Sequence, residues 1–324
     1  MRDNKYTPED LKIMQSWPLE RKIQVTQTRI IEWYQKNDGK VYVSFSGGKD
    51  STVLLDLVRR IYPDVPAVFI DTGLEYPELR EFVKTIRNVT WLKPEMNFRK
   101  VIETYGYPVI SKEVSKRVYW GRKYINENGR VGEWAYECLT QPSYTKDGKR
   151  SPYDKHKYGF LLDAPFNISD QCCYVMKKEP AHKYEKKTGK KPILATMAQE
   201  SQMRTTCWLK YGCNAFDAVY PSSKPMSFWT EQDVLCYLKE FNIPYASVYG
   251  EIKQDDENGK YYTTGCNRTG CVFCGFGCHL EKEPNRFQRL KQTHPKLWNY
   301  CMKPWDEGGL GMKEVLDYIG VKSE

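Results

Sequence analysis

Two groups of residues in this chain could do chemistry: a glycine-rich loop with a lysine, and paired cysteines. The loop reads SGGKDS over residues 46–51 and lies between a short apolar run and an amphipathic stretch. Glycines let successive backbone N–H groups converge on an anion, a helix beginning there adds a favourable dipole, and Lys49 adds charge. The spacing differs from the Walker A motif. We therefore expect a phosphate-binding loop of another type, with a turn that only caps a helix as the alternative.

The cysteines form two separated pairs, Cys172 with Cys173 and Cys271 with Cys274. A CxxC spacing lets two thiolates reach one metal or cluster, whereas adjacent cysteines do so only from a bent helical turn. A local set with C-x4-C-x2-C-x3-C spacing overlaps the second pair and comprises Cys266, Cys271, Cys274 and Cys278, with His279 beside it. The spacing leaves open a cluster held by both pairs, a local zinc or cluster site, and thiols without metal.

The hydrophobic pattern around the loop alternates between strand and helix periods. Apolar runs near residues 41–45, 67–70, 89–92 and 192–197 indicate short buried strands, and amphipathic stretches between them indicate helices. This order is typical of an α/β protein with a doubly wound parallel sheet. In such sheets ligands bind beyond the carboxyl ends of the strands. Ser44, the loop and the DTG segment at residues 71–73 are expected at that edge.

The flanking segments differ in composition from the α/β part. Residues 1–38 have apolar side chains at helical spacing and predict a helical lead-in. Residues 39–250 are expected to form the nucleotide-binding domain, interrupted at about 106–165 by an insertion rich in Tyr, Trp, Lys, Arg and Gly. Residues 251–324 are expected to form a Cys-rich C-terminal extension. We predict one catalytic domain that carries this extension.

Five ordered motifs resemble a known family. SGGKDS resembles the pyrophosphate loop (PP-loop) of the adenine-nucleotide alpha-hydrolase superfamily, whose members bind ATP and break it between the α and β phosphates. DTGLEYPE, CCYVMKKEP, QESQMR and WTEQDV followed by IPY resemble segments of the phosphoadenylylsulfate (PAPS) reductase family, over roughly residues 28–280. The resemblance implies a set of site residues. By this resemblance, the nucleotide would be bound by Ser44, Ser46, Gly47, Gly48, Lys49, Asp50, Ser51, Asp71, Thr72, Gly73 and Glu200, with Lys49, Asp50, Ser51 and Arg204 as catalytic residues. Cys172, Cys173, Cys271 and Cys274 would ligate a [4Fe-4S] cluster, as in adenylylsulfate reductases, with zinc as the alternative.

Three features depart from the reductase pattern. The loop is the intact ATP-splitting form, whereas sulfonucleotide reductases usually carry an altered one. No cysteine follows Cys301, so the nucleophile of the family's ECGLH-like motif is missing. In the family's GxRxxESxxR motif, Ala195 and Met197 replace the Gly and the first Arg, while Glu200 and Arg204 remain. We therefore expect ATP as the ligand.

The chemistry expected from these motifs is adenylylation of an acceptor. ATP with Mg²⁺ would lose pyrophosphate, and sulfur transfer supported by the cluster would follow. The combination resembles the DNA phosphorothioation sulfur-transfer branch and phage PAPS-reductase-like proteins. The alternatives are a sulfonucleotide reductase or sulfurylase-like enzyme acting on a small molecule, and a nucleotide-binding module with structural zinc.

Charge and composition suggest partners and location. The 324 residues carry a formal charge of +9, with 40% hydrophobic and 28% charged residues, which is typical of a folded protein. Within the insertion, basic and aromatic residues alternate in a mixture that suits nucleic acid, or else a solvated helix with core aromatics. They are Lys112, Lys116, Arg117, Arg122 and Lys123, among Tyr119, Trp120 and Tyr124. The expected partners are ATP, a sulfur donor protein such as a cysteine desulfurase, nucleic acid and further copies of the chain. No apolar run approaches a membrane span and the start lacks the core of a secretory signal, so we expect a cytoplasmic protein.

Overall fold

The computed structural model describes residues 4–127, 131–151 and 153–324. The chain forms two compact units, and each unit is assembled from separate stretches of sequence. The first comprises residues up to 71 together with 75–93 and 180–269, and the second comprises 72–74, 94–179 and 270–324. The ranges predicted from sequence, 1–38, 39–250 and 251–324, follow the order of the chain and stay a prediction about its domains.

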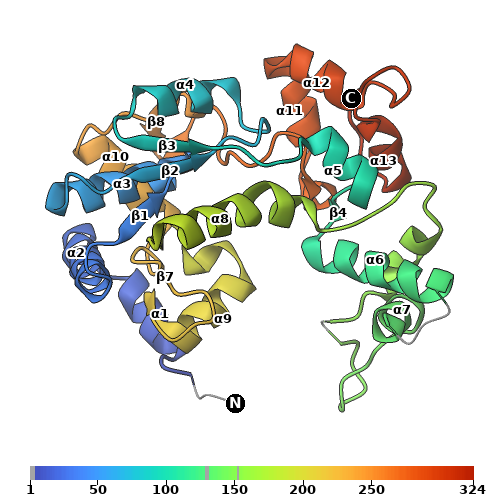
Figure 1. Ribbon diagram of the computed structural model, residues 1–324, viewed down its shortest axis with the longest axis horizontal. Coiled ribbons are helices and arrows are strands. Elements are labelled where there is room, and N and C mark those ends of the chain that lie inside the picture. The colour runs from blue at the N-terminus through green and yellow to red at the C-terminus, as the bar shows by residue number, and fades with distance from the viewer. Residues whose placement is uncertain (1–3, 128–130, 152) are drawn as a thin grey trace. The chain divides into compact units, whose positions relative to one another are not determined.

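A six-stranded sheet lies at the centre of the first unit, with strand order β3-β2-β1-β5-β7-β6 (Figure 1). Its strands are β1 (Val41–Ser44), β2 (Ala67–Ile70), β3 (Val89–Leu92), β5 (Lys191–Leu194), β6 (Asn214–Ala215) and β7 (Ser222–Ser223). All neighbouring pairs are parallel except β6 with β7, which is antiparallel. The predicted α/β class with a mainly parallel sheet is confirmed.

Helices cover both faces of this sheet. They are α1 (Pro8–Gln15), α2 (Leu19–Lys36), α3 (Lys49–Ile61), α4 (Pro77–Thr85), α8 (Glu179–Thr188, from residue 180 on in this unit), α9 (Gln202–Tyr211) and α10 (Glu231–Glu240), with the short 3-10 helices η3 (Ala198–Glu200) and η4 (Ser247–Tyr249). Alternate residues of a strand point to opposite faces. In β1, Val43 joins the same hydrophobic core as Leu54 of α3. Tyr42 instead donates a hydrogen bond to Glu185 of α8 at 2.8 Å. Helices α3 and α8 therefore lie on opposite faces, as a doubly wound sheet requires.

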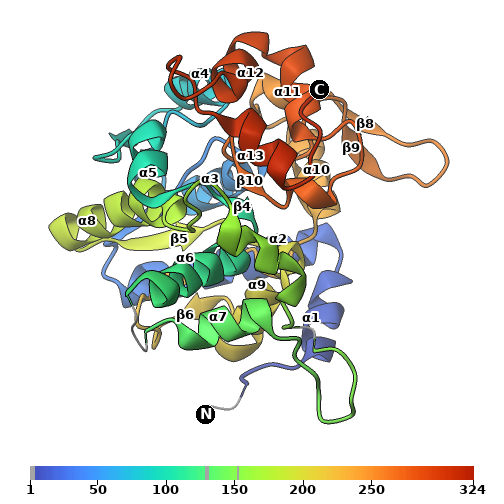
Figure 2. The ribbon, with the colours of Figure 1, turned by 90° about the vertical axis from the view of Figure 1, so that its right-hand side faces the viewer.

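A hairpin follows the last helix of this unit. Its strands β8 (Ile252–Gln254) and β9 (Tyr261–Thr263) are antiparallel, and it projects from the body of the unit (Figure 2). Backbone hydrogen bonds from Gly265 to Tyr249 and from Cys266 to Val248 bring the chain after β9 back toward η4. The hairpin thus returns residues 265–269 to the region of the sheet's nucleotide loop.

The second unit is mostly helical. Its elements are α5 (Phe98–Tyr105), β4 (Val109–Ile110), α6 (Lys112–Glu127), α7 (Glu133–Thr140), the 3-10 helix η1 (His156–Asp163), the π-helix η2 (Tyr174–Lys178), β10 (Gly275–Phe276), the 3-10 helix η5 (Cys278–Leu280), α11 (Arg286–Thr293), α12 (Pro295–Met302) and α13 (Met312–Tyr318). Strands β4 and β10 pair in parallel, with Val109 opposite Gly275. This pairing holds the segment after the CxxC motif against the start of the predicted insertion.

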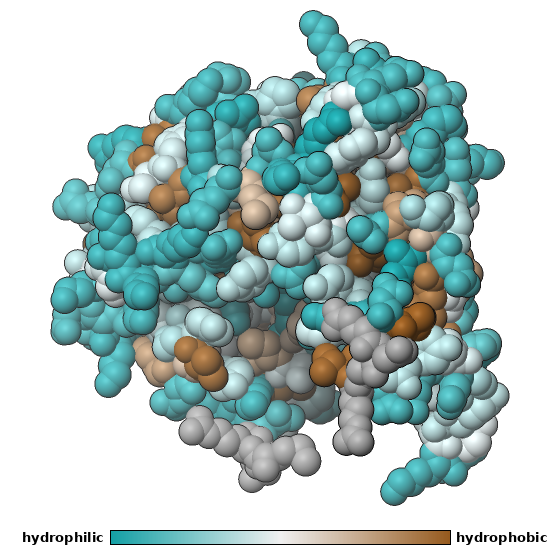
Figure 3. Space-filling view, turned by 45° about the vertical axis from the view of Figure 1, so that its right-hand side comes forward, coloured by the Kyte–Doolittle hydropathy of each residue, from teal (hydrophilic) through white to brown (hydrophobic). Residues whose placement is uncertain are grey.

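The surface has the mixed character of an ordinary folded protein. On the face shown in Figure 3, hydrophobic residues form small groups separated by hydrophilic ones. Within the described part of the chain, no helix is both long enough and apolar enough to cross a membrane.

The predicted helical lead-in is confirmed, and a buried ion pair attaches it to α10. Lys22 of α2 has a side chain only 1% exposed, and its Nζ lies 2.6 Å from Asp233 Oδ2. The same Nζ donates to the carbonyl oxygen of Gln15 at 2.7 Å. Asp233 also accepts from the backbone N–H of Thr230 in the capping box that begins α10. One carboxylate therefore fixes both the start of α10 and the position of α2.

We expect Lys22→Ala to lower the free energy of unfolding by about 3 kcal/mol or more, because the change leaves a largely buried carboxylate without its cation. Urea denaturation measures this. The matched control is Lys12→Ala, since Lys12 and its partner Glu9 are 76% and 73% exposed and 3.8 Å apart. That control should change the free energy by no more than about 0.5 kcal/mol. Equal effects of the two substitutions would contradict a stabilising role for the buried pair.

Candidate functional site

The predicted phosphate loop connects the end of β1 to the first turn of α3. Gly48 is the N-cap of α3, and its backbone N–H donates to Ser46 Oγ at 3.3 Å. The backbone N–H of Ser46 in turn donates to Ser51 Oγ at 3.2 Å. The loop therefore folds tightly over the N-terminus of the helix, where backbone N–H groups and the helix dipole favour an anion.

Gly47 must be glycine for two separate reasons. Its φ of +74° lies in the left-handed region, which side chains with a Cβ rarely adopt. A Cβ there would also lie 2.8 Å from Val83 Cγ2 and 3.3 Å from the carbonyl oxygen of Leu79, both on α4. The loop can take this path against α4 only without a side chain.

Lys49 is buried, with only 4% of its side chain exposed. Its Nζ donates to the carbonyl oxygen of Asn267 at 2.5 Å and lies 2.9 Å from Glu231 Oε1. Its backbone N–H donates to the hydroxyl of Tyr249 at 3.3 Å, and that hydroxyl lies 2.5 Å from Thr269 Oγ1. The loop lysine is thus held by residues that follow it by about two hundred positions.

Asp50 follows this lysine and is half-buried, with its Oδ1 atom buried. Burial raises the pKa of its carboxyl group, and the nearby Lys49, Arg268 and Arg204 oppose that rise. Among the described residues, nothing forms a hydrogen bond with Asp50 Oδ1, although this atom is buried. A buried oxygen without a partner suits a hard cation such as Mg²⁺.

Glu200 gathers two guanidinium groups near the loop. It forms ion pairs with Arg204 and, through Oε1 at 3.5 Å, with Arg268. Its Oε2 also accepts from the backbone N–H of Met197 at 2.8 Å, which fixes the carboxylate. Burial lowers the pKa of Arg204 and the neighbouring Arg268 lowers it further, whereas Asp50 raises it. Three cations, Lys49, Arg204 and Arg268, therefore lie near Asp50, and the carboxylates of Glu200 and Glu231 pair with them.

The remaining predicted nucleotide residues follow the first two strands. Ser44 ends β1, and Asp71 directly follows β2 and forms an ion pair with Arg80 at 2.8 Å. Thr72 Oγ1 accepts from the backbone N–H of Leu74 at 3.2 Å, and Gly73 has a φ of +73°. Thr72 and Gly73 belong to the second unit, whereas the loop, Glu200 and Arg204 belong to the first. The structure therefore gathers the loop with Glu200 and Arg204, and the roles of the DTG residues stay a prediction.

Sequence reasoning missed five residues that contact the loop or its partners. They are Glu231, Tyr249, Asn267, Arg268 and Thr269. Glu231 lies in the WTEQDV motif and Tyr249 closes the segment after IPY, so both stood within motifs that the resemblance identified. Arg268 and its neighbours precede the CxxC motif. Nothing in their spacing to Lys49 indicated contact, because the fold alone brings them together.

The four predicted metal-binding cysteines all belong to the second unit. The Sγ atoms of Cys172 and Cys173 are 4.0 Å apart. The hydrogen bond between them raises the pKa of Cys172, as do burial and the nearby Cys274 and Cys271. The same hydrogen bond, with Lys112 and Lys177 nearby, lowers the pKa of Cys173 to about 6. The pKa of Cys172 therefore responds to each of the other three cysteines.

The backbone around these cysteines suits a shared site. The π-helix η2 begins directly after Cys173. The adjacent cysteines therefore lie next to a widened helical turn, as expected if both are to reach one metal or cluster. Burial raises the pKa of Cys274 to about 11, while a backbone N–H of Phe276 donates to its sulfur and lowers it. Arg286 donates to the carbonyl oxygen of Cys274 at 3.0 Å. Hydrogen bonds and cations at thiolates are features that also tune iron–sulfur clusters.

The local C-x4-C-x2-C-x3-C alternative includes Cys278. Its Sγ donates to the carbonyl oxygen of Gly275 at 3.0 Å, and burial raises the pKa of this thiol to about 11. Among the described residues, no group of three or more His, Cys, Asp or Glu side chains is arranged to hold a metal ion. The cluster held by both pairs and the local site therefore both stay predictions.

Two of the basic residues predicted to suit nucleic acid are used inside the second unit. Arg122 donates to four backbone carbonyl groups, at Leu161, Leu162, Ala164 and Phe166. Arg117 is buried, pairs with Glu113 at 2.7 Å and lies over the ring of Trp134. These arginines are not available to phosphate groups, because they hold α6 against its neighbours. Lys112 and Lys116 are exposed.

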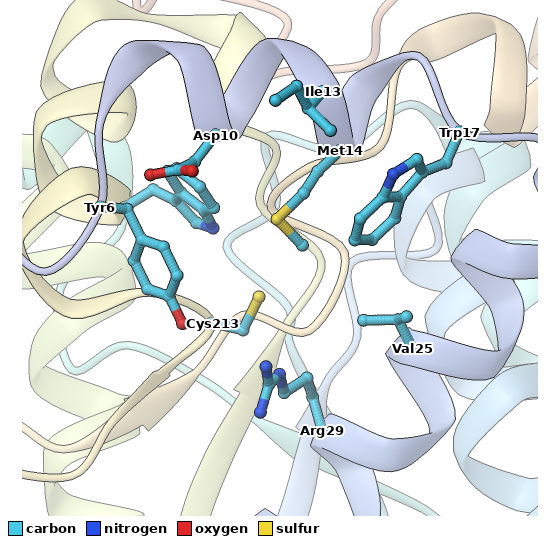
Figure 4. A pocket seen from close by; sticks show the side chains of 9 residues that line it. Tyr6, Asp10, Ile13, Met14, Trp17, Val25, Arg29 and Cys213 are labelled. Carbon is cyan, nitrogen blue, oxygen red and sulfur yellow. The ribbon is translucent and has the colours of Figure 1, made fainter.

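A separate hollow in the first unit lies between α1, α2 and α9 (Figure 4). It has a volume of about 320 Å³ and mainly apolar walls. Its lining residues are Tyr6, Asp10, Ile13, Met14, Trp17, Val25, Arg29, Trp208 and Cys213. Arg29, its cationic residue, is held by Glu32 at 2.8 and 2.9 Å. None of the predicted site residues lines it, so the chemistry of the loop lies elsewhere.

The fold and the loop together define a class: an α/β protein with a glycine loop of the phosphate-binding kind where β1 meets α3. Comparison with known families narrows this class. The Phosphoadenosine phosphosulfate reductase domain matches residues 40–116 and 143–275, well over half of the chain. The chain belongs to the PAPS reductase family of the PP-loop superfamily, and the predicted family is confirmed.

Individual relatives agree with this assignment. An uncharacterized protein of Methanocaldococcus jannaschii is 35% identical over 304 residues, covering 89% of this chain and 53% of that protein. A second one is 26% identical over 271 residues, covering 82% and 41%. This chain therefore spans about half the length of these relatives. An adenosine 5'-phosphosulfate reductase of Staphylococcus epidermidis is 22% identical over 242 residues, covering 73% of each chain.

We expect Gly47→Ala to lower the free energy of unfolding by about 2 kcal/mol or more, because it adds backbone strain and a clash with α4. Urea denaturation measures the loss. Gly189→Ala is the matched control, since Gly189 has a φ of +69° but its Cβ would meet nothing within 4 Å. It should cost only the strain of about 1 kcal/mol. If the two substitutions cost the same, contact with α4 does not require glycine in the loop.

Proposed function

We propose that this chain is an enzyme that binds ATP at residues 46–51 and adenylylates an acceptor, releasing pyrophosphate as the activating step of sulfur transfer. The observation that supports this most directly is the environment of the loop. Lys49 is buried at the start of α3, Asp50 Oδ1 is buried without a hydrogen-bond partner among the described residues, and Arg204 and Arg268 lie near Asp50. A nucleoside polyphosphate with a divalent cation would match this set of charges.

The proposed step is a displacement at the α phosphorus. An acceptor oxygen forms a bond to that phosphorus, the bond to the α–β bridging oxygen breaks, and pyrophosphate leaves with the electron pair. The proton of the acceptor passes to solvent. When sulfur at the oxidation level of sulfide then replaces the adenylylated oxygen, AMP leaves and no oxidant or reductant is consumed.

The residues of the chain would act by positioning and by electrostatics. Backbone N–H groups of the loop and the ammonium of Lys49 would bind the β and γ phosphates and stabilise the charge on pyrophosphate. Asp50 would hold Mg²⁺, which neutralises phosphate charge. Glu200 would orient Arg204 toward the nucleotide.

The two cysteine pairs would serve the sulfur-transfer half of the reaction. Cys172, Cys173, Cys271 and Cys274 would hold a [4Fe-4S] cluster, which supplies or carries sulfur when it is bound. The acceptor and the sulfur donor protein belong to this proposal as well. The exposed Lys112 and Lys116 of α6 are compatible with a nucleic-acid acceptor.

The second candidate is a sulfonucleotide reductase. It is favoured by the similarity to an adenosine 5'-phosphosulfate reductase of Staphylococcus epidermidis, which is 22% identical over 73% of this chain. The two candidates differ in their nucleotide, because a reductase binds adenylylsulfate or its 3'-phosphorylated form. Ligand preference therefore separates them.

We expect isothermal titration calorimetry to show that ATP with Mg²⁺ binds and that Lys49→Ala weakens this binding at least about tenfold, since each 1.4 kcal/mol of lost interaction is a factor of ten. Lys84→Ala is the matched control, because Lys84 is 58% exposed on α4 and pairs with the nearby Glu81 at 2.6 Å. It should leave ATP affinity unchanged. Binding of adenylylsulfate without any binding of ATP would replace the adenylylation proposal with the reductase.

Metal analysis after anaerobic purification tests the cysteine site. We expect iron and sulfide in near-equal amounts, and a Cys271→Ala, Cys274→Ala double variant that loses both while still binding ATP. Cys236→Ala is the control, because Cys236 is in the first unit and outside both pairs. Stoichiometric zinc without iron, together with full metal retention in a Cys172→Ala, Cys173→Ala variant, would favour the local site instead.

A further inference from the structure

The lysine of the phosphate loop already has a carboxylate partner within the chain. Glu231 is the first residue of α10, and its Oε1 lies 2.9 Å from Lys49 Nζ. The two side chains differ in their exposure to solvent: that of Lys49 is 4% exposed, whereas that of Glu231 is 46% exposed. Glu231 can therefore turn away into solvent, while Lys49 stays in place.

Other donors of the loop are occupied in the same way. The backbone N–H of Lys49 donates to the hydroxyl of Tyr249 at 3.3 Å. The Nζ of Lys49 also donates to the carbonyl oxygen of Asn267 at 2.5 Å. Tyr249 is itself fixed by Thr269 at 2.5 Å. Oxygen atoms from three parts of the chain thus lie on donors that a phosphate would use.

We propose that Glu231 is a specificity-determining residue: its carboxylate competes with ligand phosphates for Lys49, so it lowers the affinity of the site for ligands whose phosphates reach that lysine and leaves the affinity for shorter ligands unchanged. The inference rests on the proposed function, since it assigns a role in the same nucleotide site. A ligand that reaches Lys49 must displace Glu231 and gains a charge-assisted contact of its own in return. A ligand whose phosphate stops short of Lys49 leaves the ion pair intact.

The charges around the loop determine whether removing the charge of Glu231 strengthens or weakens ligand binding. Glu231 pairs with Lys49, which precedes Asp50 in the chain, so two acidic side chains lie at the place expected for the phosphates. A carboxylate there repels a polyphosphate as well as competing for Lys49. Removing the charge of Glu231 should therefore tighten binding, whereas removing a carboxylate that helped to hold the ligand would weaken it.

The test is calorimetry of Glu231→Gln with ATP, AMP and inorganic pyrophosphate, each with Mg²⁺. We expect the dissociation constants for ATP and pyrophosphate to fall about threefold to thirtyfold and that for AMP to change less than about twofold. Glu240→Gln is the matched control, because Glu240 is exposed at the other end of the same helix. It should leave all three constants within about twofold.

Tyr249→Phe gives an independent reading if the first variant folds poorly. It removes the hydroxyl that occupies the backbone N–H of Lys49, and it should also tighten pyrophosphate binding. Unchanged or weakened affinity for ATP and pyrophosphate in Glu231→Gln, with wild type binding ATP, would overturn the competition and leave the proposed function standing. Tighter pyrophosphate binding in a protein that does not bind ATP would leave the competition standing and overturn the proposed function. Absence of binding by either ligand to either protein would overturn both.

Discussion

The first unit is organised around one constraint, a lysine that is almost fully removed from water at the start of a helix. A buried ammonium group is costly unless charges and hydrogen-bond acceptors surround it. Lys49 meets this need through Glu231 at the start of α10 and through the Asn267 carbonyl in the segment after β9. Helix α10 is fixed in turn, because Asp233 in its first turn caps the helix and pairs with the buried Lys22 of α2. The helical lead-in therefore supports the site, although it contributes no residue to it.

The charges near the loop form two linked sets. Lys49 pairs with Glu231, and Glu200 pairs with both Arg204 and Arg268. Asp50 lies near Lys49, Arg204 and Arg268, so the three cations are matched by three carboxylates. A divalent cation at Asp50, as proposed, would add the positive charge that attracts an anion, whereas a phosphate must still displace Glu231 to reach Lys49.

Local features of the fold and the site could be predicted from sequence, and long-range ones could not. Strand and helix periods and the glycines of SGGKDS act over a few residues, so the sheet class and the loop were predictable. Glu231, Tyr249 and Asn267 contact Lys49 across about two hundred residues, a distance that spacing cannot encode. Composition also misjudged Arg122, because a guanidinium that holds four backbone carbonyl groups and one that faces a phosphate look the same in sequence.

The phosphate loop and the two cysteine pairs differ in which groups they bring together. At the loop, groups of opposite charge pair with each other, and these pairs stabilise the folded chain. Because the contact of Glu231 with Lys49 competes with a ligand, it adds to the stability of the fold and lowers the affinity for the ligand. At the cysteines, like groups meet. The hydrogen bond with Cys173, burial and neighbouring thiols raise the pKa of Cys172, burial and the neighbouring Cys271 raise that of Cys274, and the hydrogen bond with Cys172 lowers that of Cys173. Gathering four sulfur atoms gives the fold little by itself, since each thiolate would repel the others. A bound metal ion or cluster would attract all four thiolates. Binding of that group would therefore also stabilise the folded chain at this site.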